Sequence, residues 1–430
     1  MATAAFYTLG CKVNQTDTAA LQNLLAQAGY HTVTFDEVAD VYVINTCTVT
    51  HLGDRKSRQM IRRARRKNPD AVIVVTGCYA QVAADDIMNI SDVDLAIGTH
   101  SREQLPELIM QAKQGRINCV APMEQKHSFD GLGVAQSGER TRAFLKVQEG
   151  CRQFCSYCIV PYARGPVYSR PLAESFHEAQ KLVAQGFREL VVTGIHLGYY
   201  GVDLAGDFAL SDLLRRLASV NGLARIRISS LEPTEVTADL LDVMQDYSNV
   251  CHHLHIPLQS GDDDVLRRMN RKYDASEFLR LVDWIRAQIP DIALTTDVMV
   301  GFPGETEEQF QHTCEVVHRA AFSRLHVFKY SPRQGTPAAN YDQQVPPPIK
   351  DKRSHTLTEL GEELAVQYRK RFIGTTMNVL FEEDPTSNQR AGLTEHYLRV
   401  TVMSSKDLVG AILPVKITSV VADGLTGRLL

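Results

Sequence analysis

Six of the nine cysteines in this 430-residue chain fall into two sets of three. The compact triplet, Cys151, Cys155 and Cys158, has the spacing C-x3-C-x2-C. The dispersed triplet is spread over the N-terminal part of the chain, and each of its members follows an apolar run: Cys11, Cys47 and Cys78. Three thiolates can hold a four-iron cluster and leave one iron open to a small molecule. The two sets therefore predict two metal centres suited to chemistry.

The dispersed triplet constrains the fold of the N-terminal part. The apolar runs before its cysteines lie at residues 5–10, 41–45 and 71–76, helical patterns separate them, and a fourth run follows at 94–98. This alternation is typical of a parallel α/β sheet, in which the carboxyl ends of the strands meet where ligands bind. Any one of these cysteines is weak evidence alone, because free cysteine is often buried. We expect an α/β domain over 1–123 and a Gly-rich polar linker over 124–140.

The central part of the chain predicts a barrel. Six apolar runs alternate with helical segments, and each ends in polar or Gly/Pro-rich residues, at 143–147, 189–192, 224–228, 253–258, 293–300 and 325–330. Active sites of β/α barrels lie at such strand ends. Six units rather than eight favour a partly open (β/α)6 barrel over 141–366, with room for a large substrate.

The last part predicts strands. Apolar runs lie at 377–381, 397–403 and 411–421, with turn signals at Asp384-Pro385 and Asp423-Gly424. A charged helical stretch to about Lys370 precedes them. We expect a small all-β barrel over 367–430.

Composition excludes several classes of protein. No apolar run approaches the roughly 18 residues that a membrane span needs. Nine cysteines in a long chain without a secretion signal favour reduced thiols or metal ligands over disulfides, so we expect a cytoplasmic protein. The net charge of −4 gives no overall sign of nucleic-acid binding, although a local cluster can still provide it.

The compact triplet has a rival interpretation as a structural zinc site. Zinc prefers four closed ligands, and no fourth Cys or His lies at finger spacing nearby. The cluster interpretation is therefore favoured.

At this point the sequence resembles a known family. The segment Cys151–Gly165 is similar to the signature of radical S-adenosylmethionine enzymes, and the motifs around the dispersed triplet resemble the methylthiotransferase branch, closest to the tRNA threonylcarbamoyladenosine methylthiotransferases. These motifs are Leu9-Gly-Cys-Lys-Val-Asn-Gln15, Asn45-Thr-Cys-Thr-Val-Thr50 and Thr76-Gly-Cys-Tyr-Ala-Gln81. One departure, Thr16-Asp17-Thr18, where related sequences often have Glu, touches no proposed ligand.

The resemblance implies two 4Fe-4S clusters and S-adenosylmethionine as both radical source and methyl donor. The compact triplet would be catalytic, holding the cluster that cleaves S-adenosylmethionine to a deoxyadenosyl radical. The dispersed triplet would hold an auxiliary cluster whose open iron carries the sulfur to be methylated and delivered. An electron donor such as flavodoxin or ferredoxin is implied, while the source of sulfur stays open. The three other cysteines, Cys119, Cys251 and Cys314, are expected to be packing residues.

Cofactor contacts are expected at the barrel strand ends and in the cysteine loop: Tyr157, Thr193, Gly194, Ser230, Glu232, Gln259 and Asp297. The glycines near Thr193 allow close backbone approach, and a carboxylate such as Glu232 can accept from two ribose hydroxyls. The rival at Ser230 and Glu232 is a plain helix cap, and at Asp297 a structural turn. His253 and His255 are as well explained as hydrogen-bonded core groups.

One helix predicts RNA contact. Residues 55–67 contain eight Lys or Arg and no acid, with Met60, Ile61 and Ala64 as an apolar seam. The predicted phosphate-binding face consists of Arg55, Arg58, Arg62, Arg65 and Arg66. A solvated surface usually mixes in acids. The C-terminal barrel resembles a TRAM domain, a small RNA-associated module, and agrees with this prediction.

The expected activity is methylthiolation of threonylcarbamoyladenosine next to the anticodon of tRNA. The alternatives in the same branch are isopentenyladenosine in tRNA and an aspartate of a ribosomal protein, since the barrel motifs bind the shared cofactor rather than the substrate. The alternative of another class is a non-catalytic RNA-binding protein with structural metal.

Overall fold

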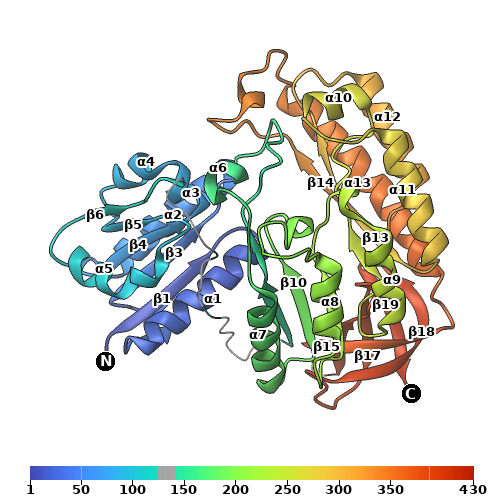
Figure 1. The fold of residues 1–430 in the computed structure, drawn as a ribbon, viewed down its shortest axis with the longest axis horizontal. Helices are drawn as coiled ribbons and strands as arrows, with labels where there is room; N and C mark the ends of the chain where they lie inside the picture. The colour runs from blue at the N-terminus through green and yellow to red at the C-terminus, as the bar shows by residue number, and fades with distance from the viewer. Residues whose placement is uncertain (50, 124–128, 130–132, 134–140, 387) are drawn as a thin grey trace.

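The computed structural model describes every residue except 50, 124–128, 130–132, 134–140 and 387. It has three parts in chain order, an α/β domain, a half-open barrel and a small β-barrel (Figure 1). The predicted fold class is confirmed in all three. The predicted linker lies almost wholly outside the described residues.

The N-terminal domain is a six-stranded parallel sheet of order β2-β1-β3-β4-β5-β6. Its strands are β1 (Thr3–Thr8), β2 (His31–Val33), β3 (Val41–Thr46), β4 (Val72–Gly77), β5 (Leu95–Ile97) and β6 (Ile117–Cys119). Its helices are α1 (Lys12–Gln27), α2 (His51–Lys67), α3 (Cys78–Val82), α4 (Ala84–Met88) and α5 (Leu105–Ala112). The central strands β3 and β4 are buried throughout, as expected of a parallel sheet covered on both faces. The sequence did not predict β2 and β6, because three partly exposed residues carry no periodicity.

The central domain places six parallel strands in two groups of three, β11-β10-β7 and β12-β13-β14. The strands are β7 (Arg142–Lys146), β10 (Glu189–Thr193), β11 (Arg225–Ile228), β12 (His253–His255), β13 (Ala293–Val300) and β14 (Arg324–Lys329). Two isolated bridges join the groups, one from Ile226 of β11 to Val250 and one from Ser230 to His255 of β12. The outer helices are α7 (Leu172–Ala184), α8 (Leu210–Ala218), α9 (Ala238–Asp246), α10 (Asp263–Arg268), α11 (Ala275–Gln288) and α12 (Glu307–Ala320).

The barrel is open between its first and last strands. Within the described chain, β7 and β14 each pair with one neighbour only. Helix α1 packs against β7, and α3 packs against α6 (Val160–Arg164), so the N-terminal domain borders this opening (Figure 1). The partly open barrel that six units predict is therefore confirmed.

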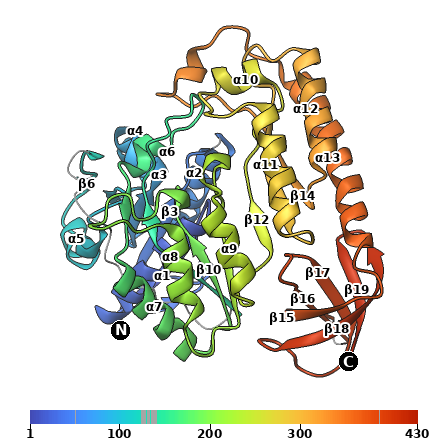
Figure 2. The same ribbon diagram turned by 45° about the vertical axis from the view of Figure 1, so that its right-hand side comes forward.

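Helix α13 (Pro347–Lys370) leads from the barrel to the C-terminal domain, beginning with proline where a missing N–H costs nothing. Figure 2 shows it beside α11 and α12. The closed barrel has the order β15-β16-β17-β19-β18. Its strands are β15 (Thr376–Thr386), β16 (Gln389–Leu393), β17 (Arg399–Met403), β18 (Ile412–Val421) and β19 (Gly424–Leu429).

Of the two predicted turns in this barrel, one is confirmed and one is wrong. The chain turns before Gly424, as predicted. It continues as β15 through Asp384 and Pro385, where the register with β16 shifts between Phe381 and Thr386. Such irregular pairing accommodates a proline inside a strand, because it removes the need for one ladder hydrogen bond.

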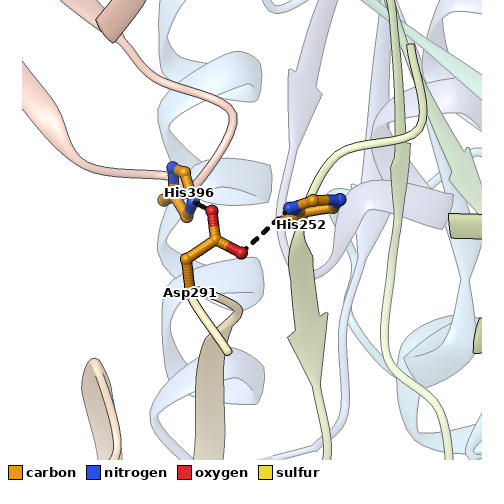
Figure 3. Close-up of side chains that lie close together, drawn as sticks. All are labelled: His252, Asp291 and His396. Atoms are coloured by element: carbon orange, nitrogen blue, oxygen red, sulfur yellow. Dashed lines mark hydrogen bonds and ion pairs between the residues drawn. The ribbon is translucent and has the colours of Figure 1, made fainter. Parts of the chain in front are cut away.

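A carboxylate bridges the central and C-terminal domains (Figure 3). Asp291, which precedes β13, accepts from His396 of the C-terminal barrel and from His252, each at 3.1 Å. His396 is buried, whereas the Asp291 side chain is 50% exposed. The hydrogen bond from His396 lowers the pKa of Asp291 to about 2. The junction is thus held in part by a charge-assisted contact open to solvent.

None of the described helices has both the length and the apolar character that a membrane crossing would require.

Candidate active site

The compact triplet lies in a loop whose two ends are held together. Cys151 donates its backbone N–H to the carbonyl of Gly165 at 3.0 Å. Gly150 has φ of +77°, and a Cβ there would lie 1.7 Å from the Pro166 carbonyl oxygen. Only glycine permits this approach. The closed loop keeps the three cysteines beside one another.

The chemistry of this set fits a metal cluster. Burial, together with the neighbouring thiols of Cys155 and Cys151, raises the pKa of Cys158 to about 12. The described cysteines form no disulfide. Each thiol makes ionisation of its neighbours less favourable. A cation bound by all three sulfur atoms would stabilise the thiolates instead, so this set suits a metal cluster.

Two residues from the barrel contact the compact triplet. His196 Nδ1 lies 3.2 Å from Cys151 Sγ, and its Nε2 contacts Glu235. Burial lowers the pKa of His196, but its hydrogen bonds to Cys151 and Glu235 outweigh this and raise it to about 9. Arg271 donates to Cys155 Sγ at 3.3 Å. The sequence analysis did not single out either residue, although His196 lies close to the predicted contacts Thr193 and Gly194.

The dispersed triplet gathers at one edge of the N-terminal sheet. Cys11 follows β1, Cys47 follows β3 and Cys78 follows β4, and these three strands are neighbours. Gly10, at φ of +104°, is so close that a Cβ there would lie 2.8 Å from the Cβ of Cys47. The sheet therefore brings together cysteines far apart in sequence, as predicted.

This second set also fits a cluster. Burial, together with the neighbouring thiols of Cys78 and Cys11, raises the pKa of Cys47 to about 11. Cys78 is buried, Cys47 is half-buried and Cys11 is exposed. One side of the set is thus accessible, as an open metal position requires.

A buried ion network connects the two triplets. Arg164, which ends α6 and is fully buried, donates through Nε to Cys78 Sγ at 3.3 Å. Its Nη1 lies 2.8 Å from Asp17 and 3.2 Å from Glu149, two residues before Cys151. Arg164 therefore contacts the dispersed triplet while belonging to the loop of the compact one.

Asp17 is the shared anion of this network. It also pairs with Lys146 at 2.8 Å and with Arg102 at 2.9 Å. Burial raises the pKa of Asp17, but the charges of Arg102, Lys146 and Arg164 together hold it well below its usual value. The sequence departure at Thr16–Thr18 was expected to touch no ligand, and none is touched directly. Asp17 nevertheless holds the arginine that contacts Cys78.

A cavity of about 570 Å³ is lined by residues of both the N-terminal domain and the barrel. Cys11 and its neighbour Lys12 line it from the N-terminal domain. Burial lowers the pKa of Lys12. From the barrel it is lined by four of the predicted cofactor contacts: Thr193, Gly194, Ser230 and Asp297. One cavity is therefore shared by a cysteine of the dispersed triplet and by the predicted cofactor site.

The other three predicted cofactor contacts lie outside that lining. The Glu232 carboxylate is bound by Arg271, so its acceptor atoms are already engaged. Gln259 has φ of +63° and exchanges backbone hydrogen bonds with β13. Tyr157 packs beside the apolar cluster around Phe302, and its burial raises its pKa well above the usual value. Cofactor contact by these three stays a prediction.

Gly194 serves a second purpose. A Cβ at this position would lie 2.7 Å from Gln148 Oε1, which accepts from the backbone of His196. In this structure, the group that comes close to the backbone of Gly194 is therefore the Gln148 side chain.

The basic helix α2 buries the predicted seam of Met60, Ile61 and Ala64. Its arginines divide into two kinds. Arg65 is bound inside the domain, to Asp94 at 2.6 Å and to backbone carbonyls, and Arg58 donates to Tyr79. The exposed members of the predicted face are Arg55, Arg62 and Arg66.

The three remaining cysteines are at least partly buried. Cys251 is 2% exposed, and Cys119 and Cys314 pack against apolar clusters. This agrees with their expected role in packing.

Comparison with known proteins identifies the family. Residues 3–98 match the model described as uncharacterized protein family UPF0004, and residues 145–317 match that of the radical SAM superfamily. The fold is similar to that of a radical S-adenosylmethionine methyltransferase, TsrM, from Kitasatospora setae, with TM-score 0.59 and 16% identity over 78% of this chain and 76% of that one.

Curated relatives match over nearly the whole length. The threonylcarbamoyladenosine tRNA methylthiotransferase MtaB of Bacillus subtilis is 45% identical over 97% of this chain and 94% of its own, and that of Thermotoga maritima is 36% identical over 99% and 96%. A tRNA-2-methylthio-N(6)-dimethylallyladenosine synthase of Clostridium tetani is 33% identical over 98% and 95%. With these identities over nearly the full length of both chains, and with the radical SAM match in the barrel, the chain belongs to the radical S-adenosylmethionine methylthiotransferase family of enzymes.

Proposed function

We propose that this enzyme converts threonylcarbamoyladenosine next to the anticodon of tRNA into its 2-methylthio derivative. The observation that carries the proposal is the shared cavity, in which Cys11 of the dispersed triplet faces the same space as the predicted cofactor residues of the barrel. Three relatives, which are 45%, 36% and 38% identical to this chain, are named for this substrate. Because its substrate would be tRNA, we place the enzyme in the cytoplasm.

The cofactors of the family are 4Fe-4S clusters and S-adenosylmethionine. We assign one cluster to Cys151, Cys155 and Cys158 and the other to Cys11, Cys47 and Cys78. When bound, these groups supply radical chemistry at an unreactive C–H bond, together with the sulfur and the methyl group that replace the hydrogen.

The residues around the cysteines would fix their positions. Arg271, itself bound by Glu232, orients Cys155, and His196 orients Cys151. Arg164 sets the distance between the two triplets, because it contacts Cys78 from the loop that carries Cys158. Such contacts keep ligands in place and tune the sites that they form.

Each of the three domains has its own proposed role. We assign the dispersed triplet to residues 1–123, the radical barrel to 141–366 after a linker at 124–140, and RNA contact to a TRAM-like barrel at 367–430, with α13 running across the last boundary. The exposed arginines of α2, which follows Cys47, add phosphate contacts. The target base would leave its stack to enter the cavity, and a flavodoxin or ferredoxin would supply electrons.

The decisive experiment is reconstitution under anaerobic conditions. We expect brown protein with about eight irons, consistent with two four-iron clusters. Incubation with S-adenosylmethionine, a reductant and tRNA bearing threonylcarbamoyladenosine should yield the methylthio nucleoside by mass spectrometry. Product from isopentenyladenosine tRNA alone would contradict the proposed substrate.

A further inference from the structure

The shared cavity contains two cations from different domains. Lys12 follows Cys11 at the start of α1, and Arg324 begins the last barrel strand, β14. Lys12 is half-buried and Arg324 is exposed. Neither side chain forms a hydrogen bond or an ion pair with a residue that the structure describes.

Other cations near the cavity are paired. Arg227 is 2.9 Å from Glu189, and Lys146 is 2.8 Å from Asp17. Asp297 is the only carboxylate among the described lining residues, and His255 Nε2 lies 3.3 Å from it. The lining therefore carries two unpaired positive groups, and its one acid already has a partner.

The three histidines of the lining do not explain this charge, since His255 lies beside the carboxylate of Asp297 and the other two are neutral. Burial holds the pKa of His253 well below its usual value, and burial also lowers that of His326. Both are therefore neutral near pH 7. The positive character of the cavity comes from the Lys12 and Arg324 side chains.

Placing an ammonium beside a cavity with no anionic partner is costly, and an anionic ligand removes that cost. The substituents named for the relatives differ in this respect. A threonylcarbamoyl group joins threonine through its nitrogen and leaves a free carboxylate, whereas a dimethylallyl group is apolar.

We propose that Lys12 and Arg324 form a subsite for the carboxylate of the threonylcarbamoyl group and so determine which modified adenosine enters the cavity. The inference rests on the proposed function. Because Lys12 adjoins Cys11, the carboxylate is held at the side of the cavity where the dispersed triplet lies. An apolar substituent leaves both cations without a partner, so the subsite also selects against it.

The test pairs a change in the enzyme with a change in the substrate. Three anticodon stem-loops are compared, carrying threonylcarbamoyladenosine, its methyl ester and unmodified adenosine. With reconstituted wild-type enzyme we expect the acid to exceed the ester by roughly 10- to 100-fold, both in binding affinity and in kcat/KM for methylthiolation, the effect of one or two charge-assisted hydrogen bonds.

In Lys12→Met the acid and the ester should become nearly equal, and Lys12→Arg should restore part of the preference. Arg324→Met should reduce the preference in the same direction. Arg280→Met, an exposed arginine of α11, is the matched control and should keep it. Iron content and deoxyadenosine formation without RNA are measured in each variant, and in Arg280→Met both should match wild type.

A wild-type preference kept in both Lys12→Met and Arg324→Met would overturn the subsite, as would an equal loss on acid and ester. If Lys12→Met fails to load iron because it adjoins Cys11, the Arg324→Met ratio decides. Failure of the proposed function would be recognised by a different result from failure of the subsite. Wild type would then form no methylthio product from the acid, while the binding preference for acid over ester would still report on the subsite.

Discussion

Each cysteine triplet brings three thiols together, but one does so within a single loop and the other through a folded sheet. The compact triplet lies within one loop, closed by Gly150 and by a backbone hydrogen bond to Gly165. The dispersed triplet exists only when three strands of one sheet are formed and in register. A local loop can place ligands with little help from the fold, whereas a site at strand ends depends on the stability of the whole domain.

Their surroundings differ in the same way. The compact triplet receives His196 and Arg271 from its own barrel. The guanidinium that contacts the dispersed triplet, Arg164, comes from the central domain. The dispersed site is therefore completed by docking of the two domains.

The largest expected effects separate the roles of the triplets. Cys155→Ala should abolish deoxyadenosine formation from S-adenosylmethionine, because the compact set loses a ligand. Cys47→Ala should keep part of that cleavage yet form no methylthio product. Liquid chromatography with mass spectrometry measures both products.

Cys314→Ala, outside both sets, is the control and should retain both activities. Methylthio product from Cys47→Ala, or deoxyadenosine from Cys155→Ala, would remove the distinction between the two triplets.

Next in size is the effect of the docking network. Arg164→Met leaves Asp17 and Glu149 buried with fewer cationic partners, so we expect a loss of about 3–5 kcal/mol in the free energy of unfolding. Denaturant titration measures it. Arg63→Met, which removes an exposed pair with Asp36, should cost less than about 1 kcal/mol. Equal losses would show that burial of the network is unimportant.

A smaller effect is expected from the helix that follows Cys47. Changing Arg62 and Arg66 to Glu should weaken tRNA binding by about tenfold and flatten its salt dependence, because phosphate contacts release counterions. Arg280→Glu with Arg319→Glu makes the same charge change on exposed residues of α11 and α12. If tRNA affinity falls equally in both double variants at several salt concentrations, the loss reflects the net charge of the protein and not contacts made by α2.

The smallest effect concerns the second domain junction. Asp291→Asn should reduce stability by at most about 1 kcal/mol, because the carboxylate is half exposed and solvent screens its contacts. The folded pKa of about 2 lies below the unfolded value. The contribution is therefore present above about pH 4 and lost only as the pH falls toward 2. Melting curves of both proteins should become more alike as the pH falls from about 4 toward 2, and a difference that stays the same over that range would refute the assignment.

Much of the fold could be predicted from the sequence, because long apolar runs bounded by turn residues set the strands. β13 (Ala293–Val300) has the bounds that its run predicts. The three-residue edge strands could not be found, since β2 and β6 gain their structure from the neighbouring strand. The turn at Asp384-Pro385 was wrong because local propensity could not foresee an irregular strand pairing.

The sequence by itself determined the two cysteine sets and the strand ends that carry them, because spacing and periodicity are local properties of the chain. Only the tertiary structure decided that Asp17 and Arg164 join the sets, that Arg65 is bound inside its domain, and that Lys12 and Arg324 share a cavity. Charged residues take their roles from their partners, and those partners lie on segments that only the folded chain brings together.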